Sequence, residues 1–431
     1  MASAQQITLK PQLPQASPPS LRTNFKWTFA GSFIYALCQW GMLSVLAKAG
    51  NASIVGQFAL GLAISAPVFM FANLQLRAVQ ATDVRREYRF ADYFTLRILT
   101  TTAGFAAVTC LVLALPFDKT TRGVVLLVAL AKSIECISDV IAGLLQLHER
   151  LDQVAISFVL RGCLSILTFG AIFLSTRSLI ESVAAMCLAR LLAVSIYDLR
   201  RAKEALHRNE RWFRLDWRAS RRLFLLSLPL GLVMMLISLD ANIPRYLLEH
   251  FSGSSELGIF ASLAYLLVAV SMIVSALGQS ATVRLSSMFA GCDFTGFKRL
   301  MLKLGAIGVA IMVLGLAVAA LWGRILLTLL YRPEYGKHTA LLLILMASAG
   351  VGAVGSFMGY GLTAARCFRS QVPLIATSTL ISAAVAALLV PHYGSIGAAL
   401  GVLASALAFA AGAALLLVCF TRNAMKQVQS I

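Results

Sequence analysis

The chain has 431 residues, of which 59% are hydrophobic and 13% are charged, and its mean hydropathy is +0.82. A soluble domain is about half apolar and a quarter charged, so this much apolar surface excludes a soluble enzyme. At roughly 35 residues for each span with its connection, the length allows about twelve transmembrane helices. The net charge of +19 is explained by cytoplasmic loops, which collect Lys and Arg, so we expect a lipid bilayer and no nucleic acid as partner.

The first 26 residues contain four prolines and no apolar run, which predicts a disordered cytoplasmic tail (1–26) and not a signal peptide. Six apolar spans then form an N-terminal lobe over 27–199, and a basic cytoplasmic linker covers 200–222. Six further spans and a short cytoplasmic tail form a C-terminal lobe over 223–431. The predicted spans are 27–48, 54–76, 94–116, 122–145, 154–175, 180–199, 223–243, 256–280, 303–323, 339–364, 371–390 and 395–420.

The positive charges predict the orientation of these spans. With the N-terminus inside, the inner segments hold 25 Lys and Arg residues and the outer segments hold eight. Cytoplasmic loops carry the excess of Lys and Arg in bacterial membrane proteins. We therefore expect a multi-pass protein of the bacterial inner membrane with both termini in the cytoplasm.

An internal repeat predicts the relation between the two lobes. The segment Ser53-Ile-Val-Gly-Gln-Phe-Ala59 recurs 202 residues later as Ser255-Glu-Leu-Gly-Ile-Phe-Ala261, and each copy opens the second span of its half. Six spans return the chain to the same side, so the halves have the same orientation and are related by an axis along the membrane normal. The fold class is therefore an all-α membrane protein with two six-helix lobes around a central cavity.

Charged residues concentrate inside the spans of the N-terminal lobe. Lys132, Glu135 and Asp139 follow the spacing i, i+3, i+7, which places them on one stripe of the fourth span. A charge at mid-bilayer costs roughly 2.5–3.5 kcal/mol, so each one requires a reason. Lys132 and Glu135 can neutralise one another, and we expect Asp139 to face Arg161 or Arg190 on the next two spans.

Two readings of these charges are open: ion pairs that fix helix packing, or a water-filled cavity for an anion. Basic residues suit an anionic ligand, because Arg grips phosphate through two hydrogen bonds. The predicted substrate-binding residues are Lys132, Arg161, Arg190, Arg97 and Arg77, although ion pairing or snorkelling to the interface is the favoured role of the last two. The predicted ion-coupling residues, for H⁺ or Na⁺, are Glu135, Asp139 and Asp240.

No motif indicates catalysis or a resident cofactor. The eight cysteines form no CxxC pair, the five histidines lack metal-ligand spacing, and there is no GxxxxGK[ST] phosphate loop. We therefore expect no catalytic residue, no metal site, no disulfide frame and no nucleotide. Membrane transferases carry a large outer loop with catalytic acids, and the predicted outer loops are short.

Several segments resemble a known family. These are the opening Phe25-Lys-Trp-Thr-Phe-Ala-Gly-Ser-Phe-Ile-Tyr-Ala-Leu-Cys-Gln-Trp40, the Gly56-Gln-Phe-Ala-Leu-Gly61 helix start, Leu76-Arg-Ala-Val-Gln-Ala-Thr-Asp83 and Tyr393-Gly-Ser-Ile-Gly-Ala-Ala-Leu400. Together they resemble the polysaccharide transporters, or O-antigen flippases of the Wzx type. These form a branch of the multidrug/oligosaccharidyl-lipid/polysaccharide (MOP) exporter superfamily.

The resemblance implies a transporter and not an enzyme. Such a flippase moves undecaprenyl-pyrophosphate-linked oligosaccharides from the cytoplasmic to the periplasmic leaflet by alternating access, for lipopolysaccharide or exopolysaccharide export, and it works beside polysaccharide polymerase machinery. The alternative is a cation-coupled multidrug or metabolite exporter of the same superfamily, which is expected to have an acid-dominated cavity. The branch that flips peptidoglycan lipid precursors commonly has spans beyond twelve, and the sequence predicts none.

Overall fold

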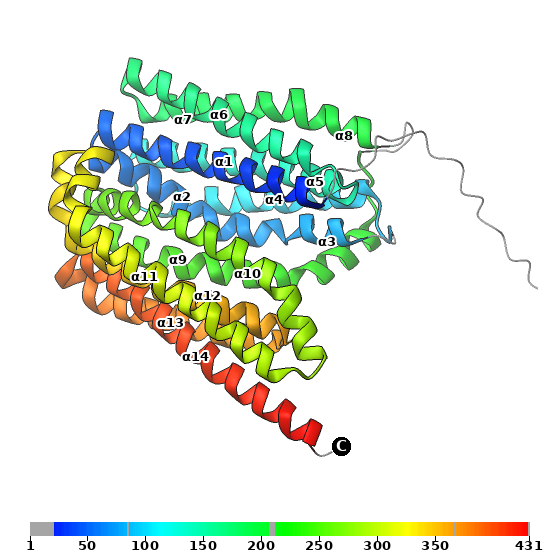
Figure 1. Ribbon diagram of the computed structural model, residues 1–431. Helices are drawn as coiled ribbons and strands as arrows, with labels where there is room; N and C mark the ends of the chain where they lie inside the picture. Colours follow the sequence, from blue (N-terminus) through cyan, green and yellow to red (C-terminus); the bar gives the residue numbers. More distant parts are fainter. Residues whose placement is uncertain (1–20, 84–85, 207–211, 366, 430–431) are drawn as a thin grey trace, which may run out of the picture.

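The computed structural model describes residues 21–83, 86–206, 212–365 and 367–429, and nearly all of these are helical (Figure 1). The elements of the N-terminal lobe are α1 (Leu21–Ala49), α2 (Ala52–Asn73), α3 (Leu76–Thr82), α4 (Phe90–Ala114), α5 (Lys119–Leu147), α6 (Leu151–Thr176), α7 (Leu179–Ala193), a π-helical turn (Val194–Asp198) and α8 (Leu199–Ala205). Those of the C-terminal lobe are α9 (Trp217–Tyr265), α10 (Leu267–Ala290), α11 (Phe294–Leu330), a 3₁₀ turn (Pro333–His338), α12 (Thr339–Ala364), α13 (Phe368–Tyr393) and α14 (Ser395–Gln429).

These helices supply the twelve predicted spans. Ten helical segments of the described chain are long and apolar enough to cross a membrane. One of them, Trp217–Ala290, bends back at Gly253, where φ is +79° and the backbone leaves the helical region, so it makes two spans. Glycine is the residue that adopts this conformation without strain. Helix α5 is also long enough to cross a membrane, and it differs from the ten segments in carrying three charges within its apolar stretch, so we count it as the twelfth span.

The two lobes repeat one packing pattern. In the N-terminal lobe α1 packs on α6, α2 on α5, α4 on α5, α6 on α7, and α5 on α7. In the C-terminal lobe the first arm of α9 packs on α13, α10 on α12, α11 on α12, α13 on α14, and α12 on α14. Each pair has its counterpart six spans later, which confirms the predicted parallel repeat.

The repeated glycines meet at the axis that relates the lobes. A Cβ on Gly56 would overlap the carbonyl oxygen of Ser254, and a Cβ on Gly258 would overlap the carbonyl oxygen of Ala52. Because Ser254 and Gly258 lie 202 residues after Ala52 and Gly56, the two contacts are reciprocal, as in a two-fold interface. The short motif found in the sequence is thus the point where the lobes touch most closely.

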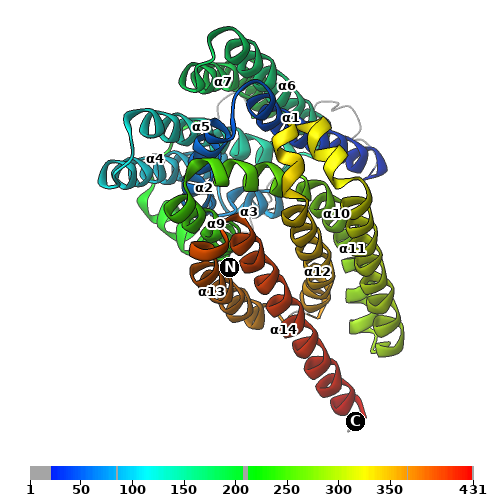
Figure 2. The same cartoon turned by 90° about the vertical axis from the view of Figure 1, so that its left-hand side faces the viewer.

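Further contacts between the lobes gather at the same end of the bundle, which we call the seam end. Trp40 Nε1 donates to the Tyr331 hydroxyl at 3.1 Å, and Ser44 Oγ donates to the Leu330 carbonyl at 3.0 Å. Arg332 Nε donates to the Lys48 carbonyl at 3.1 Å. Figure 2 shows the segment between α11 and α12 beside α1 at this end. At the opposite, linker end, α14 points away from the N-terminal lobe (Figure 1).

The helices are longer than the predicted spans, because hydropathy marks only the lipid-facing part of a helix. Helix α1 begins at Leu21, so residues 21–26 of the predicted disordered tail are helical, and residues 1–20 lie outside the described residues. The predicted linker 200–222 is also partly helical: α8 extends to Ala205 and α9 begins at Trp217. Residues 207–211 of that linker lie outside the described residues.

A side chain at the reciprocal glycine contact is expected to open the seam. Gly258→Ala places a methyl group against the Ala52 carbonyl and must move α2 away from α9. We expect a cysteine introduced at Ser44 to react several-fold faster with a membrane-impermeant maleimide in this variant than in the parent. Gly170→Ala in α6 is the matched control, because its Cβ meets no atom within 4 Å. Equal labelling in both variants would contradict a closed seam.

Candidate functional site

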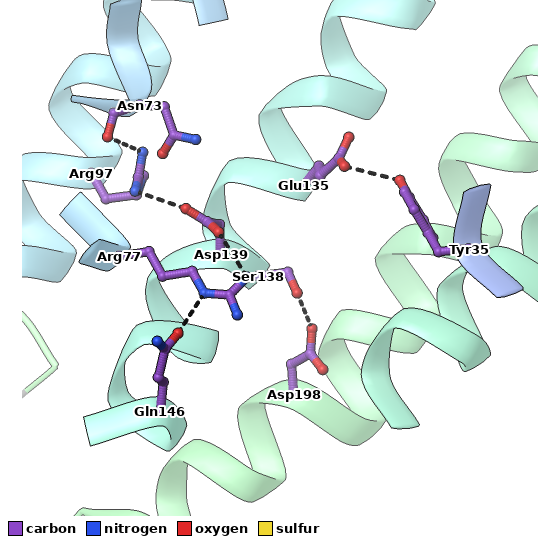
Figure 3. Close-up of polar contacts among 9 residues, drawn as sticks. All are labelled: Tyr35, Asn73, Arg77, Arg97, Glu135, Ser138, Asp139, Gln146 and Asp198. Atoms are coloured by element: carbon purple, nitrogen blue, oxygen red, sulfur yellow. Dashed lines mark hydrogen bonds and ion pairs between the residues drawn. The ribbon is translucent and has the colours of Figure 1, made fainter. Parts of the chain in front are cut away.

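Helix α5 carries the charged stripe of the N-terminal lobe. The helix starts at an Asp118 cap, whose carboxylate accepts hydrogen bonds from the backbone amides of Thr120 and Thr121. Its regular turns then align Lys132, Glu135 and Asp139, as the spacing predicts. Figure 3 shows that the stripe divides into two groups, one around Asp139 and one around Glu135.

The first group is an ion-pair cluster around Asp139. Arg97 Nη2 lies 3.2 Å from Asp139 Oδ2, and Arg77 Nη1 lies 3.7 Å from Oδ1 (Figure 3). Arg97 is fully buried, and its Nη1 donates to the Asn73 carbonyl at 2.9 Å. Arg77 Nε donates to Gln146 Oε1 at 3.0 Å. The expectation that Asp139 faces Arg161 or Arg190 is therefore wrong, because Arg97 and Arg77 reach it from α4 and α3.

The second group surrounds Glu135 with donors. Lys132 Nζ lies 2.9 Å from Glu135 Oε2, and Arg190 Nη1 lies 3.7 Å from the same oxygen. The Tyr35 hydroxyl donates to Oε1 at 2.9 Å (Figure 3). Arg190 Nε also donates to Ser165 Oγ at 3.2 Å. The carboxylate of Glu135 thus holds one ammonium group and one guanidinium group inside the N-terminal lobe.

Arg161 differs from these residues because it forms no salt bridge with any described acid. Its side chain is 4% exposed, and it makes no hydrogen bond or ion pair with any described residue. Its guanidinium lies 5.1 Å from the centre of the Phe158 ring and 5.9 Å from that of Tyr35. Cation–π contacts of this kind are worth about 0.5–2 kcal/mol and hold the group in place. Its N–H donors remain available for an anion.

The structure adds three residues that sequence reasoning missed. Tyr35 links Glu135 to Arg161, but in the sequence it is one aromatic residue in an apolar span. Asp198 lies within electrostatic range of Arg161 and accepts a hydrogen bond from Ser138 (Figure 3). The sequence feature that could have identified Asp198 is its position as an acid just before the basic linker. Arg245 lies two residues beyond the predicted end of span seven at 243, but α9 continues past it.

Asp240 lies apart from these groups. It belongs to α9 in the C-terminal lobe, and its Oδ1 accepts a hydrogen bond from Ser405 Oγ of α14 at 2.8 Å. No Lys or Arg of the described chain forms an ion pair with it. The structure therefore separates Asp240 from the two other predicted ion-coupling residues, which are both neutralised by basic side chains.

The arrangement around Arg161 is suited to bind an anion. Lys132, Arg161 and Arg190 outnumber the carboxylates of Glu135 and Asp198, and a fourth cation, Arg245, comes from the other lobe. Tyr265, the last residue of α9, lies near Glu135, Arg190 and Arg245. A phosphate-bearing ligand would therefore meet positive charge on both sides of the lobe boundary. Within the described residues, no group of three His, Cys, Asp or Glu side chains is arranged to hold a metal ion.

Comparison with known sequences gives a family match over most of the chain. A family model described as "Polysaccharide biosynthesis protein" matches residues 21–289. The "Capsular polysaccharide biosynthesis protein CapF" of Staphylococcus aureus is 28% identical over 384 residues, which cover 88% of this chain and 94% of that protein.

Solved structures give the fold. "Lipid II flippase MurJ, inward closed conformation" superposes with a TM-score of 0.71 at 9% identity, covering 93% of this chain and 91% of that one. A MOP superfamily transporter from Pyrococcus furiosus superposes with a TM-score of 0.62 at 14% identity, covering 94% and 95%. At these identities the likeness establishes the two-lobed fold of MOP transporters and leaves the ligand open.

Removal of the Asp139 carboxylate is expected to destabilise the protein. Asp139→Asn leaves buried Arg97 with no counter-charge, and breaking one half of a buried ion pair costs about 3–5 kcal/mol. We expect a clearly lower midpoint of thermal unfolding in detergent. Glu204→Gln is the control, because its pairs with Arg200 and Arg201 are exposed and contribute about 0–1 kcal/mol. Equal midpoints for the two variants would show that Asp139 has no structural role.

Proposed function

Because this chain belongs to the polysaccharide biosynthesis protein family, we propose that it is a flippase for undecaprenyl-pyrophosphate-linked oligosaccharides. It moves them from the cytoplasmic to the periplasmic leaflet of the bacterial inner membrane for export of a surface polysaccharide. The observation that carries this proposal is Arg161, a buried guanidinium held by two aromatic rings with its hydrogen-bond donors unused. Arg binds phosphate oxygens bidentately, and a pyrophosphate is the anionic part of such a lipid.

The position of the closed seam supports alternating access. The excess of Lys and Arg places the linker end in the cytoplasm, so the lobes are closed on the periplasmic side and diverge on the cytoplasmic side. The lipid-linked sugar enters between the lobes at the linker end, while its polyprenyl tail stays in the bilayer. Rocking of the lobes about the α2–α9 contact then separates the seam and releases the sugar on the other side.

A cation-coupled drug exporter fits the site less well. Such a protein needs a carboxylate that is free to meet a cationic substrate. Glu135 and Asp139 are each held by two basic side chains, so the charged site of the N-terminal lobe has net positive charge. A cation would be repelled there, whereas a pyrophosphate would be attracted.

Asp240 is the carboxylate best placed to couple transport to H⁺ or Na⁺. It has a hydroxyl partner and no basic partner in the described chain, so it can accept a proton or a cation without breaking an ion pair. One charge moved across 100 mV supplies about 2.3 kcal/mol, which is sufficient to bias the two states of the transporter. In this proposal Glu135 and Asp139 organise the anion site instead of carrying the ion. Polysaccharide polymerase machinery is the partner expected to consume the product.

Loss of the Arg161 charge is expected to stop flipping. Arg161→Gln removes the bidentate donor, so a strain with this variant should lose surface polysaccharide and accumulate the undecaprenyl-linked oligosaccharide at equal protein level. Arg161→Lys keeps the charge without the planar fork and should restore only part of the activity. Arg324→Gln, on an exposed face of α11, is the control and should behave as the parent. Normal export by Arg161→Gln would exclude this residue from the anion site.

Neutralising Asp240 is expected to uncouple transport from the ion gradient. With Asp240→Asn, flipping of a fluorescent lipid-linked saccharide in proteoliposomes should become slow and insensitive to an imposed H⁺ or Na⁺ gradient. The parent and Glu334→Gln, an exposed acid in the 3₁₀ turn, should accelerate in one of those gradients by about tenfold or more. Gradient dependence that survives in Asp240→Asn would assign the coupling to another group.

A further inference from the structure

The C-terminal lobe contains a cavity whose chemistry differs from that of the charged site. The cavity has a volume of about 440 Å³ and lies among α10, α12, α13 and α14. Its size falls in the range of small-molecule sites. None of the described residues that line it is charged, and its polar wall is made of hydroxyl and amide groups, chiefly Ser275, Ser356, Tyr360, Thr363 and Gln371. We call it the hydroxyl pocket.

Much of the hydrogen-bonding capacity of this pocket is unused. The hydroxyls of Ser275, Ser356 and Tyr360 make no hydrogen bond with any described residue. Gln371 Nε2 donates to Thr363 Oγ1 at 3.1 Å, which leaves its carbonyl oxygen as a free acceptor. These groups are only partly buried, so water or a ligand in the pocket can supply their hydrogen-bond partners.

Two aromatic side chains frame the pocket and rest on glycines. The Tyr360 ring lies where a Cβ on Gly278 would be, and the Phe409 ring packs beside Gly355 and Gly359. The glycines let both rings approach the neighbouring helix closely. An aromatic face beside hydroxyl and amide groups complements a sugar ring, which presents C–H groups on its faces and hydroxyls at its edge.

The hydroxyl pocket is the counterpart of the charged site under the internal repeat. The charges of the N-terminal lobe lie on α5, α6 and α7, the fourth, fifth and sixth spans of that half. The pocket is lined by α12, α13 and α14, the same spans of the other half, together with α10. The two lobes therefore present one charged and one neutral polar surface at equivalent places.

One edge of the hydroxyl pocket lies near the charged site. Leu267, at one edge of the hydroxyl pocket, lies two residues after Tyr265, which is near Glu135 and Arg190. We infer that the hydroxyl pocket binds the neutral sugar of the transported lipid while the site around Arg161 binds its pyrophosphate. This inference rests on the proposed function. A cation would require an acid, and the described lining contains none.

The test compares a lipid with and without its sugar. The probes are the lipid-linked saccharide extracted from cells that lack this chain, and undecaprenyl pyrophosphate. Binding of each to the full-length protein in nanodiscs is measured by microscale thermophoresis. We expect the parent to bind the saccharide-linked lipid about tenfold more tightly, as two or three additional hydrogen bonds imply.

The double variant Ser356→Ala/Tyr360→Phe removes two pocket hydroxyls with little change in shape. It should lose the tenfold difference and keep the parent affinity for undecaprenyl pyrophosphate, whereas Arg161→Gln should weaken both lipids. Ser287→Ala/Tyr393→Phe, which removes exposed hydroxyls of the same lobe, is the matched control and should retain the difference.

Three outcomes would overturn the inference. Equal affinity of the parent for the two lipids would remove the sugar site and leave the proposed flippase intact. An equal loss of both affinities in the double variant would mean that the hydroxyls support the fold instead of the sugar. Failure of the parent to bind either lipid would overturn the proposed function together with the sugar site.

Discussion

The cost of placing charge inside a membrane organises the N-terminal lobe. Each charge on α5 must be compensated within its reach, and the structure does this twice, with Asp139 held by Arg97 and Arg77 and Glu135 held by Lys132 and Arg190. These pairs tie α3, α4 and α7 to the central α5. The basic residues outnumber the acids, so the cations that remain after pairing form an anion-binding surface.

Arg161 is the exception to this compensation, and the exception has a physical basis. Two aromatic rings supply a partial substitute for a directly bonded counter-ion, so the guanidinium can remain buried without a salt bridge. An Arg paired with a carboxylate would have to break that pair before it could bind phosphate. A cation held by ring faces keeps its in-plane donors free, which is what a site for a transient anionic ligand requires.

The two lobes share one fold but differ in what they offer a ligand. The reciprocal contact of Gly56 and Gly258 shows that the backbones of the two lobes follow the two-fold symmetry closely at the seam. Away from the seam the side chains diverge, with charges in one lobe and hydroxyls in the other. A duplicated scaffold thus provides two surfaces of different chemistry to a substrate that itself has an anionic part and a neutral part.

The sequence by itself determined the membrane class, the number of spans and the parallel repeat. These depend on local properties: apolar length sets the spans, and the 202-residue offset sets the repeat. It also identified the α5 stripe, because i, i+3 and i+7 positions share a helix face. Only the tertiary structure decided the partners of that stripe. The pairing of Asp139 with Arg97 depends on how α3 and α4 pack on α5, and hydropathy does not encode that packing. For the same reason, only the tertiary structure revealed the roles of Tyr35 and Arg245 and the hydroxyl pocket. Each depends on side chains brought together from distant helices.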